Sequence, residues 1–363
     1  MNCPPFGVLF VQNRPHKAGA QSCLWRLLRY AAQHQLWQSL LLTSGPGWLV
    51  DACRAQQIPV LMHPFPSSRS LPARLYQNNL FAKEVHKLLE AAPFPIHLLQ
   101  GNDHQEGILT LALAKRLQLP AALLLRDSGM RQEDYAKYHV KHCQWLATIG
   151  QELHDRVASW SQRSNISTLH DGLLPEEFYP PVSPSPTTPK QILVIGSAQA
   201  NKGWSDLLAA LQILAPQQLL QGMTVDFTGS LPATAPPPQL PGCQLRFIGR
   251  IEAFQELVRR YPLVINPSRR ETFGMAAIEV LAAGVPLLSS RTGIIEQIVT
   301  DQNFLFPPGE IAALAERLRT LLLQWPQIGL DLPACQQRIQ QRFPIAQTAA
   351  CLAEQYARML QRA

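Results

Sequence analysis

Short apolar runs of strand type alternate with helix-type segments through both halves of the chain, and this alternation constrains the fold more than any other feature. Segments with apolar residues at helical spacing, such as residues 21–35 and 108–119, separate most of the strand-type runs in the first half. Such alternation is typical of a parallel sheet with helices on both faces. The strand-type runs of the first half are residues 6–12, 38–44, 58–65, 96–101, 121–127 and 145–150.

The second half repeats this scheme after a proline-rich stretch. Residues 180–189, PPVSPSPTTP, have five prolines in ten residues, which favours a stiff extended linker. We therefore predict two doubly wound Rossmann-like α/β domains, residues 1–179 and 190–344. We expect the two domains to face each other across a cleft between the carboxyl edges of their sheets, because such folds bind ligands at those edges. The strand-type runs of the second half are residues 191–196, 223–229, 244–249 and 262–268.

Composition narrows the class of partner and the compartment. A length of 363 residues suits two domains, and the net charge of +7 comes without a Lys/Arg block, so nucleic acid is not an expected partner. Seven cysteines without a C-x-x-C pair indicate free thiols in a reducing compartment and no zinc site. The amino terminus resembles a first strand more than a signal peptide, and no apolar run is long enough to span a membrane. We therefore expect a cytoplasmic protein, with peripheral membrane contact at the inner face left open.

Residues 72–89 bear on that membrane question. They combine apolar residues at helical spacing with basic residues between them. The pattern fits a packed helix with a solvated basic face, and the alternative is a surface for a membrane or an anionic acceptor.

The stretch SRRETFGMAAIEVLAAG, residues 268–284, carries two acids in different settings. It predicts a helix that begins near Thr272 and ends at Gly284. Glu279 is the only charged residue between Phe273 and Gly284 and has no cation three or four positions away. A buried unpaired carboxylate is costly, so Glu279 either takes hydrogen-bond donors from a ligand or lies at the solvent edge of the helix.

Glu271 precedes that helix, in the loop that follows a strand-type run. Backbone N–H groups near Phe273 and Gly274 are expected to point outward at the helix start, and the glycine allows close approach of a ligand. The sequence thus predicts a ligand-facing loop at the carboxyl end of a strand.

Six segments in order resemble the retaining glycosyltransferases of the GT-B fold, family 4, also described as glycosyl transferases group 1. The spacing of Glu271 and Glu279 matches the E-x7-E signature of that family. The segments are distributed over nearly the whole chain, from residue 16 to residue 318. They are HKAGAQ (16–21), LHDGLLPEEFYPP (169–181), GSAQANKG (196–203), FIGRIEAFQELVRRY (247–261) before the E-x7-E stretch, and TGIIEQIV (292–299) with NFLFPPGEIAALAERL (303–318) after it.

The resemblance implies a donor side and an acceptor side. Residues 190–344 would bind the nucleotide-sugar donor, residues 1–179 would bind the acceptor, and the helix of residues 345–363 would cross back to the amino domain. Glu279 would accept hydrogen bonds from the ribose hydroxyls of the donor, and Glu271 would contact the transferred sugar.

Further roles follow from the same resemblance. Lys202 would contact the diphosphate and stabilise the charge of the leaving phosphate, although a loop lysine in solvent is the plain alternative. The other residues expected to line the donor site are Gly19 and Ala20 at the diphosphate, Gly196 and Ser197 in the phosphate loop, Arg250 and Ile251 beside the base, and Phe273 and Gly274 next to Glu271.

Two departures from the family pattern concern the predicted catalytic groups. Many relatives have arginine where this chain has Ser197; Arg269 or Arg270 is a candidate to compensate, and the alternative is that both are ordinary surface arginines. Relatives often carry a histidine beside an aspartate where this chain has Arg126 and Asp127, which we therefore include among the candidate catalytic residues. The histidines that could substitute are His16, His63, His104 and His170.

The implied reaction is transfer of a glycosyl group with net retention, in which the acceptor attacks from the face that the nucleoside diphosphate leaves. No cofactor and no metal are expected, since the chain lacks an Asp-x-Asp motif and lysine with helix amino termini can supply positive charge. Two alternatives stay open: a catalytically weak sugar-nucleotide-binding protein and a nucleotide-sugar epimerase of the same fold. Which of UDP, GDP, ADP or TDP carries the sugar, which acceptor is used and which oligomer forms have no readable signal.

Overall fold

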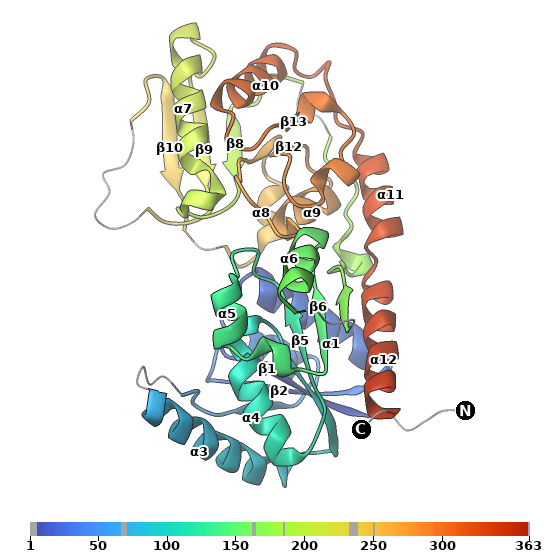
Figure 1. The fold of residues 1–363 in the computed structure, drawn as a ribbon. Helices are drawn as coiled ribbons and strands as arrows, with labels where there is room; N and C mark the ends of the chain where they lie inside the picture. Colours follow the sequence, from blue (N-terminus) through green and yellow to red (C-terminus); the bar gives the residue numbers. More distant parts are fainter. Residues whose placement is uncertain are drawn as a thin grey trace. The chain divides into compact units, whose positions relative to one another are not determined.

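The computed structural model describes residues 6–66, 71–161, 165–183, 186–231, 239–249 and 251–361, with the backbone alone for residues 71–75. The chain forms two compact units (Figure 1). The first unit comprises Met1–Gly172 together with Phe343–Ala363, and the second comprises Leu173–Arg342. Each unit is built on one wholly parallel sheet with helices, so the predicted class of two Rossmann-like α/β domains is confirmed.

The first unit has a seven-stranded sheet in the order β3-β2-β1-β4-β5-β6-β7. The strand order reverses between β1 and β4, which places a topological switch point at the carboxyl ends of these two strands. Its strands are β1 (Gly7–Gln12), β2 (Gln38–Thr43), β3 (Val60–Met62), β4 (Ile96–Gly101), β5 (Ala121–Leu125), β6 (Trp145–Thr148) and β7 (Ile166–Thr168). Its helices are α1 (Gly19–Gln33), α2 (Trp48–Ala55), α3 (Leu71–Leu89), α4 (Gly107–Leu117), α5 (Gln132–Lys137), α6 (Gln151–Ser161) and α12 (Ile345–Gln361), with the short turns η1 (His104–Glu106) and η2 (Val140–His142).

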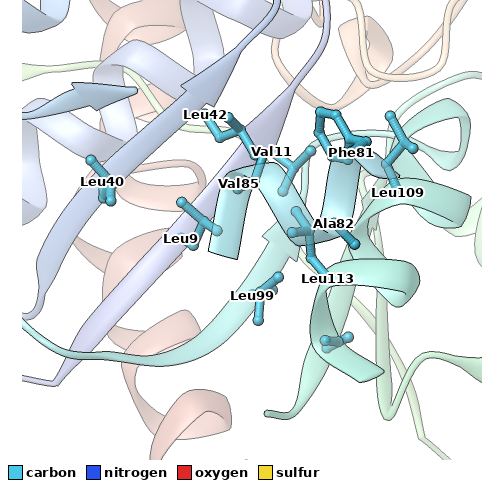
Figure 2. Packing of buried hydrophobic residues seen from close by; sticks show 12 residues of the cluster. Leu9, Val11, Leu40, Leu42, Phe81, Ala82, Val85, Leu99, Leu109 and Leu113 are labelled. Carbon is cyan, nitrogen blue, oxygen red and sulfur yellow. The ribbon is translucent and has the colours of Figure 1, made fainter. Parts of the chain in front are cut away.

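The central strands of this sheet are largely apolar because helices cover both faces. All six residues of β1 are buried. Figure 2 shows one face, where Leu9 and Val11 of β1 and Leu99 of β4 pack toward α3 and α4. The helices contribute Phe81 and Leu113, among others, to the same cluster. On the remaining side, α12 packs against α1.

The second unit has a six-stranded sheet in the order β10-β9-β8-β11-β12-β13, with its switch point between β8 and β11. Helices α7 and α10 pack together, as do α9 and α11. Its strands are β8 (Gln191–Val194), β9 (Met223–Phe227), β10 (Cys243–Phe247), β11 (Val264–Asn266), β12 (Leu287–Ser290) and β13 (Leu305–Phe306). Its helices are α7 (Trp204–Leu214), α8 (Phe254–Val258), α9 (Met275–Ala282), α10 (Ile311–Leu323) and α11 (Leu332–Arg342), with the short turns η3 (Pro175–Glu177), η4 (Ala200–Lys202), η5 (Ala215–Gln217), η6 (Ile295–Gln297) and η7 (Gln302–Phe304).

The proline-rich stretch 180–189 belongs to the second unit in its described part. Tyr179 N donates to Ala282 O (2.9 Å) and Val182 N donates to Gly284 O (2.8 Å), so the backbone on either side of Pro180 is fastened to the end of α9. The chain passes between units at 172/173 and 342/343, whereas we expected 179/180 and 344/345. The difference arises because these hydrogen bonds hold the proline-rich backbone against its own unit. No helix within the described ranges combines the length and apolar composition needed to cross a membrane.

Candidate functional site

Two loops meet at the switch point of the second sheet. One joins β8 to α7 through η4, and the other joins β11 to α9. At Gly203, with φ of +67°, a Cβ atom would lie 1.8 Å from Pro267 O, so only glycine allows the two backbones to approach this closely. Asn201 O also accepts a hydrogen bond from Arg269 N (2.8 Å). The two loops are therefore held together by their backbones.

This approach brings Lys202 and Glu271 into contact. Lys202 Nζ lies 2.8 Å from Glu271 Oε1, and the side chains are 26% and 17% exposed. Ser268 Oγ donates to the same carboxylate oxygen at 2.8 Å, and Ser290 Oγ donates to Ser268 O at 2.6 Å. The pair combines a cation and a hydrogen-bond acceptor at one accessible point of the sheet edge. An anionic ligand at this point could bind Lys202 in place of the carboxylate.

The chain after Glu271 turns sharply before α9 begins. Phe273 is buried, and Phe273 O accepts a hydrogen bond from Ile294 N (3.1 Å). A Cβ atom at Gly293 would lie 2.2 Å from that same carbonyl oxygen. Gly274 has φ of +94° and precedes the first helical residue, Met275. The predicted helix start near Thr272 is wrong, because the segment around Gly293 holds Phe273 in a turn.

Glu279 lies on the accessible side of α9. It is half-buried, as is Met275 one turn earlier, and Ala276 beside them is exposed. The opposite side of the helix is buried, from Ala277 to Ala282 apart from Glu279 itself. The predicted stop is confirmed by Gly284, whose φ is +74°. The acid thus stands at the edge of the packed helix and not in its core.

The other residues expected at the donor have varied environments. Gly196, with φ of +127°, donates its N–H to Thr228 Oγ1 (3.0 Å), which fixes the start of the loop after β8, and Ser197 beside it is half-buried. Ile251 is half-buried, while Arg250 lies outside the described residues. Within the described part of the chain, no group of three or more His, Cys, Asp or Glu side chains could hold a metal ion.

The Arg269 side chain is paired with a carboxylate. Its Nε donates to Asp206 Oδ2 (2.7 Å) and its Nη2 to Asp206 Oδ1 (2.5 Å), a bidentate pair with a buried carboxylate in the first turn of α7. The idea that Arg269 supplies the phosphate-binding cation missing at Ser197 therefore conflicts with this ion pair. Arg270, the other arginine considered, is exposed.

In the first unit, Gly19 and Ala20 form the start of α1, close to the switch point. Gly19 is exposed, and a Cβ atom there would meet no atom within 4 Å. Asn102, at the end of β4, donates its Nδ2 to Ala20 O (3.2 Å). The backbone at the start of this helix is therefore both accessible and anchored.

The two candidate catalytic residues after β5 differ in exposure. Arg126 is buried and makes an ion pair with Asp171. Burial, the largest single effect, would lower the pKa of Arg126, but the charge and hydrogen bond of Asp171 together with the nearby Cys23 and Asp103 raise the pKa above its ordinary value. Asp127 is exposed and accepts a hydrogen bond from Gly129 N (2.6 Å), which closes a local turn. A direct contact of the Arg126 guanidinium with a substrate conflicts with this burial.

Four histidines were candidates for the missing imidazole. His104 is buried, which would lower its pKa, but the hydrogen bond and charge of Asp103 together with the charges of Asp127 and Asp134 raise its pKa above the ordinary value. His63 Nε2 lies 3.1 Å from Glu84 Oε2, away from the switch point, and His16 is exposed in the loop before α1. His170 O accepts a hydrogen bond from Thr348 Oγ1 (2.8 Å). Two of the four follow a central strand at the switch point, the exposed His16 after β1 and the buried His104 after β4.

Sequence reasoning missed several polar residues that organise both edges. Their shared signal is a polar side chain at the last position of a buried strand or within two positions after it, where parallel strands present their carboxyl ends to a ligand. In this chain the pattern marks Gln12, Asn102, Asp103, Ser268 and Ser290.

The fold and this site define an α/β protein made of two Rossmann-like units, the architecture of GT-B glycosyltransferases. Residues 175–334 match the model of the family described as glycosyl transferases group 1. The match covers much of the second unit, including the loops of Lys202 and Glu271.

Solved structures give the same architecture over nearly the whole chain. HepE of Anabaena in complex with UDP and glucose is similar with a TM-score of 0.75 and 16% identity, over 96% of this chain and 99% of that one. The sucrose-phosphate synthase of Thermosynechococcus elongatus is similar with a TM-score of 0.71 and 15% identity, over 99% and 100% of the two chains. At these identities the likeness concerns the fold.

Curated proteins are similar at the level of sequence. Glycogen synthase of Mycobacterium tuberculosis is 28% identical over 284 residues, which are 72% of this chain and 61% of that relative's length. A GDP-mannose-dependent phosphatidylinositol dimannoside mannosyltransferase of the same species is 30% identical over 101 residues, 28% of this chain and 22% of that relative. The chain thus spans about three fifths of the glycogen synthase that it matches.

Proposed function

We propose that this chain is a retaining glycosyltransferase that moves a sugar from a nucleotide-sugar donor to a hydroxyl-bearing acceptor without a metal ion or other cofactor. The observation that carries the proposal is the contact of Lys202 with Glu271 at the switch point of the second sheet, inside the segment that matches the glycosyl transferases group 1 family. The similar solved structures with UDP, and with UDP and glucose, support a nucleotide-sugar as the donor.

In this proposal the Lys202–Glu271 pair has different partners with and without bound donor. Without donor, each group neutralises the other. When a diphosphate arrives, Lys202 Nζ exchanges the carboxylate for phosphate oxygen, and Glu271 becomes free to accept hydrogen bonds from hydroxyls of the transferred sugar. Ser268 Oγ keeps Glu271 Oε1 in place during this exchange. A lysine positioned in advance stabilises the negative charge that develops on the leaving phosphate.

Other residues complete the donor site in this proposal. Glu279 accepts from the ribose hydroxyls, and the glycine at 274 leaves the amide end of α9 open to the sugar. Gly196 and Ser197 line the phosphate loop, Arg250 and Ile251 border the base, and Gly19 with Ala20 present the amide end of α1 to the diphosphate.

The reaction exchanges one carbon–oxygen bond for another. The acceptor hydroxyl oxygen bonds to the anomeric carbon while the bond from that carbon to the phosphate oxygen breaks. The acceptor proton passes to an oxygen of the leaving phosphate, so the products are the glycoside and the nucleoside diphosphate. Because the leaving group takes the proton from the same face, no separate carboxylate base is needed and the anomeric configuration is retained.

The same proposal includes a cytoplasmic location, supported by cysteines that form no disulfide within the described residues. Contact with the inner face of a membrane belongs to it only if the acceptor is a lipid.

A thermal-shift panel of nucleotides and nucleotide sugars tests donor binding first. A ligand at about 100 times its dissociation constant stabilises the protein by about 2.7 kcal/mol, which shifts the melting temperature measurably. Product analysis with the donor so identified then separates the readings: a new glycoside supports transfer, a free epimer of the donor indicates an epimerase, and binding without turnover indicates a binding protein. Activity in the presence of a chelator tests metal independence.

Variants of the two glutamates test whether these residues bind the donor. We expect Glu279→Gln to raise the KM for the donor about tenfold, as loss of hydrogen bonds to a charged acceptor would, with the smaller effect on kcat. Glu271→Gln should lower kcat at least tenfold, because its contacts are to the sugar that moves. Glu316→Gln, on the exposed surface of α10, is the matched control. If Glu271→Gln and Glu279→Gln both fold and turn over like the control, the site is elsewhere.

A further inference from the structure

Arg126 occupies an unusual place for a candidate catalytic residue. It follows β5, and its side chain is 5% exposed. Its Nη1 donates to Asp171 Oδ2, and its Nε donates to Asn102 Oδ1 at 3.0 Å. A buried guanidinium needs a compensating carboxylate, and Asp171 supplies it. The side chain is therefore directed into the first unit and not toward solvent.

The contact with Asn102 determines which way that amide faces. An arginine side chain has only donors, whereas an asparagine amide has one acceptor oxygen and one donor nitrogen. Arg126 Nε therefore selects Oδ1, and the Nδ2 group of Asn102 must face the other way. There it donates to Gln12 Oε1 (2.6 Å) and to Ala20 O (3.2 Å).

These two acceptors bracket the loop between β1 and α1. Gln12 is the last residue of β1, and Ala20 is the second residue of α1. Asn102 thus links the two ends of the segment 13–18 from the neighbouring strand β4. Asn102 N also donates to Val11 O (3.1 Å), so the amide is itself fixed to the sheet.

We propose that Arg126 is a positioning residue: by fixing the orientation of the Asn102 amide, it sets the backbone at the start of α1, where Gly19 and Ala20 lie. The part of this inference that concerns the donor rests on the proposed function, in which that backbone binds the diphosphate. Arg126 acts in it without touching the substrate. A lysine could keep the charge opposite Asp171 but lacks the second, angled donor that reaches Asn102.

The test compares Arg126→Lys, Asn102→Ala and the double variant with Arg131→Lys, a control at an exposed arginine of the same unit. Thermal unfolding first confirms that each variant is folded. Hydrogen exchange of the backbone amides in residues 13–20, measured without any ligand, then reports on the loop directly. We expect exchange to rise about tenfold in Arg126→Lys and in Asn102→Ala, the change that loss of one charge-assisted hydrogen bond brings. The double variant should exchange no faster than Asn102→Ala, because both changes remove the same link.

Binding supplies the second readout. The dissociation constant of the preferred nucleoside diphosphate should rise about tenfold in Arg126→Lys, while that of the corresponding nucleoside should not change, because the nucleoside lacks the phosphates that this loop would bind. A role in general stability would not distinguish the two ligands.

The outcomes separate the two proposals. If exchange in residues 13–20 of a folded Arg126→Lys protein equals that of the control, or if the double variant shows additive effects, the positioning role is refuted. If exchange rises as expected but the wild-type protein binds no nucleoside diphosphate, the positioning role stands and the proposed function fails. If exchange rises and nucleoside and nucleoside diphosphate weaken equally, the loop is positioned but does not bind the diphosphate, and the donor part of the inference is refuted.

Discussion

Replacing Glu106 with glutamine should make the first unit more stable at neutral pH, although the change removes a carboxylate that accepts two hydrogen bonds. Glu106 lies in η1 after β4 and is 4% exposed. Its Oε1 accepts from Asn13 N (3.2 Å) and from Gln12 Nε2 (3.4 Å). Burial, and then the negative charge of Asp103, raise the pKa of Glu106 from 4.5 to about 7, and the hydrogen bond from Asn13 offsets them only in part.

The sign follows from the protons bound in each state. Between pH 4.5 and about 7 the folded protein keeps the Glu106 proton while the unfolded chain has lost it, so the free energy of unfolding falls as the pH rises through this window. The difference between the two pKa values corresponds to about 3 kcal/mol, fully lost above pH 7. Glutamine resembles the protonated acid in shape and carries no charge. Glu106→Gln should therefore match the wild type near pH 4.5 and exceed it by up to about 3 kcal/mol at pH 8.

The assay is urea unfolding between pH 5 and pH 8, followed by hydrogen exchange in peptides from β1 and β4 so that the first unit is monitored by itself. Glu90→Gln, at an exposed carboxylate of the same unit, is the matched control. His104, whose raised pKa also makes stability fall as the pH rises, is present in every protein compared, so its contribution changes in Glu106→Gln only through its electrostatic coupling to Glu106. A difference between Glu106→Gln and wild type that does not change with pH would refute the assignment of this proton to Glu106.

Two further predictions concern the second unit. Gly203→Ala should destabilise it by roughly 3 kcal/mol or more in thermal unfolding, because the added methyl group meets Pro267 O, whereas Gly309→Ala, with φ of +80° and no atom within 4 Å, should cost only about 1 kcal/mol of backbone strain. Ser268→Ala removes the hydroxyl that donates to Glu271 and should lower kcat about tenfold with little change in donor binding; an unchanged kcat in steady-state assays would show that Glu271 needs no such support.

Local patterns in the sequence predicted the two sheets and the loops at the carboxyl edge of the second sheet. Each buried strand can be recognised from its own apolar run, as in β1. Polar residues that follow a parallel strand lie at the carboxyl edge of the sheet, independently of the other segments of the chain. Lys202 and Glu271 could therefore be assigned to one sheet edge, since each follows a strand of the second sheet. Their direct contact at 2.8 Å depends on the close packing of Gly203 on Pro267, which no local pattern reveals.

Features that depend on distant partners could not be predicted in this way. The start of α9 is moved to Met275 by Gly293 and Ile294, which follow the helix in the sequence. Arg126 and Asp171 are 45 positions apart, so nothing near Arg126 indicates that its charge is already neutralised. Such pairings depend on the tertiary packing of the whole chain, so no local sequence pattern predicts them.

The discontinuous composition of the first unit has a consequence for its biosynthesis. Tyr356 of α12 is fully buried, its ring packs against Trp37 at a centroid distance of 5.3 Å, and its hydroxyl donates to Gln100 of β4. A ribosome must therefore translate the entire second unit before the first can bury these groups. Until Tyr356 has emerged, Trp37 packs only with earlier residues such as Phe10, and Gln100 lacks the hydroxyl of Tyr356, so this part of the first unit completes its packing only after the last helix is made.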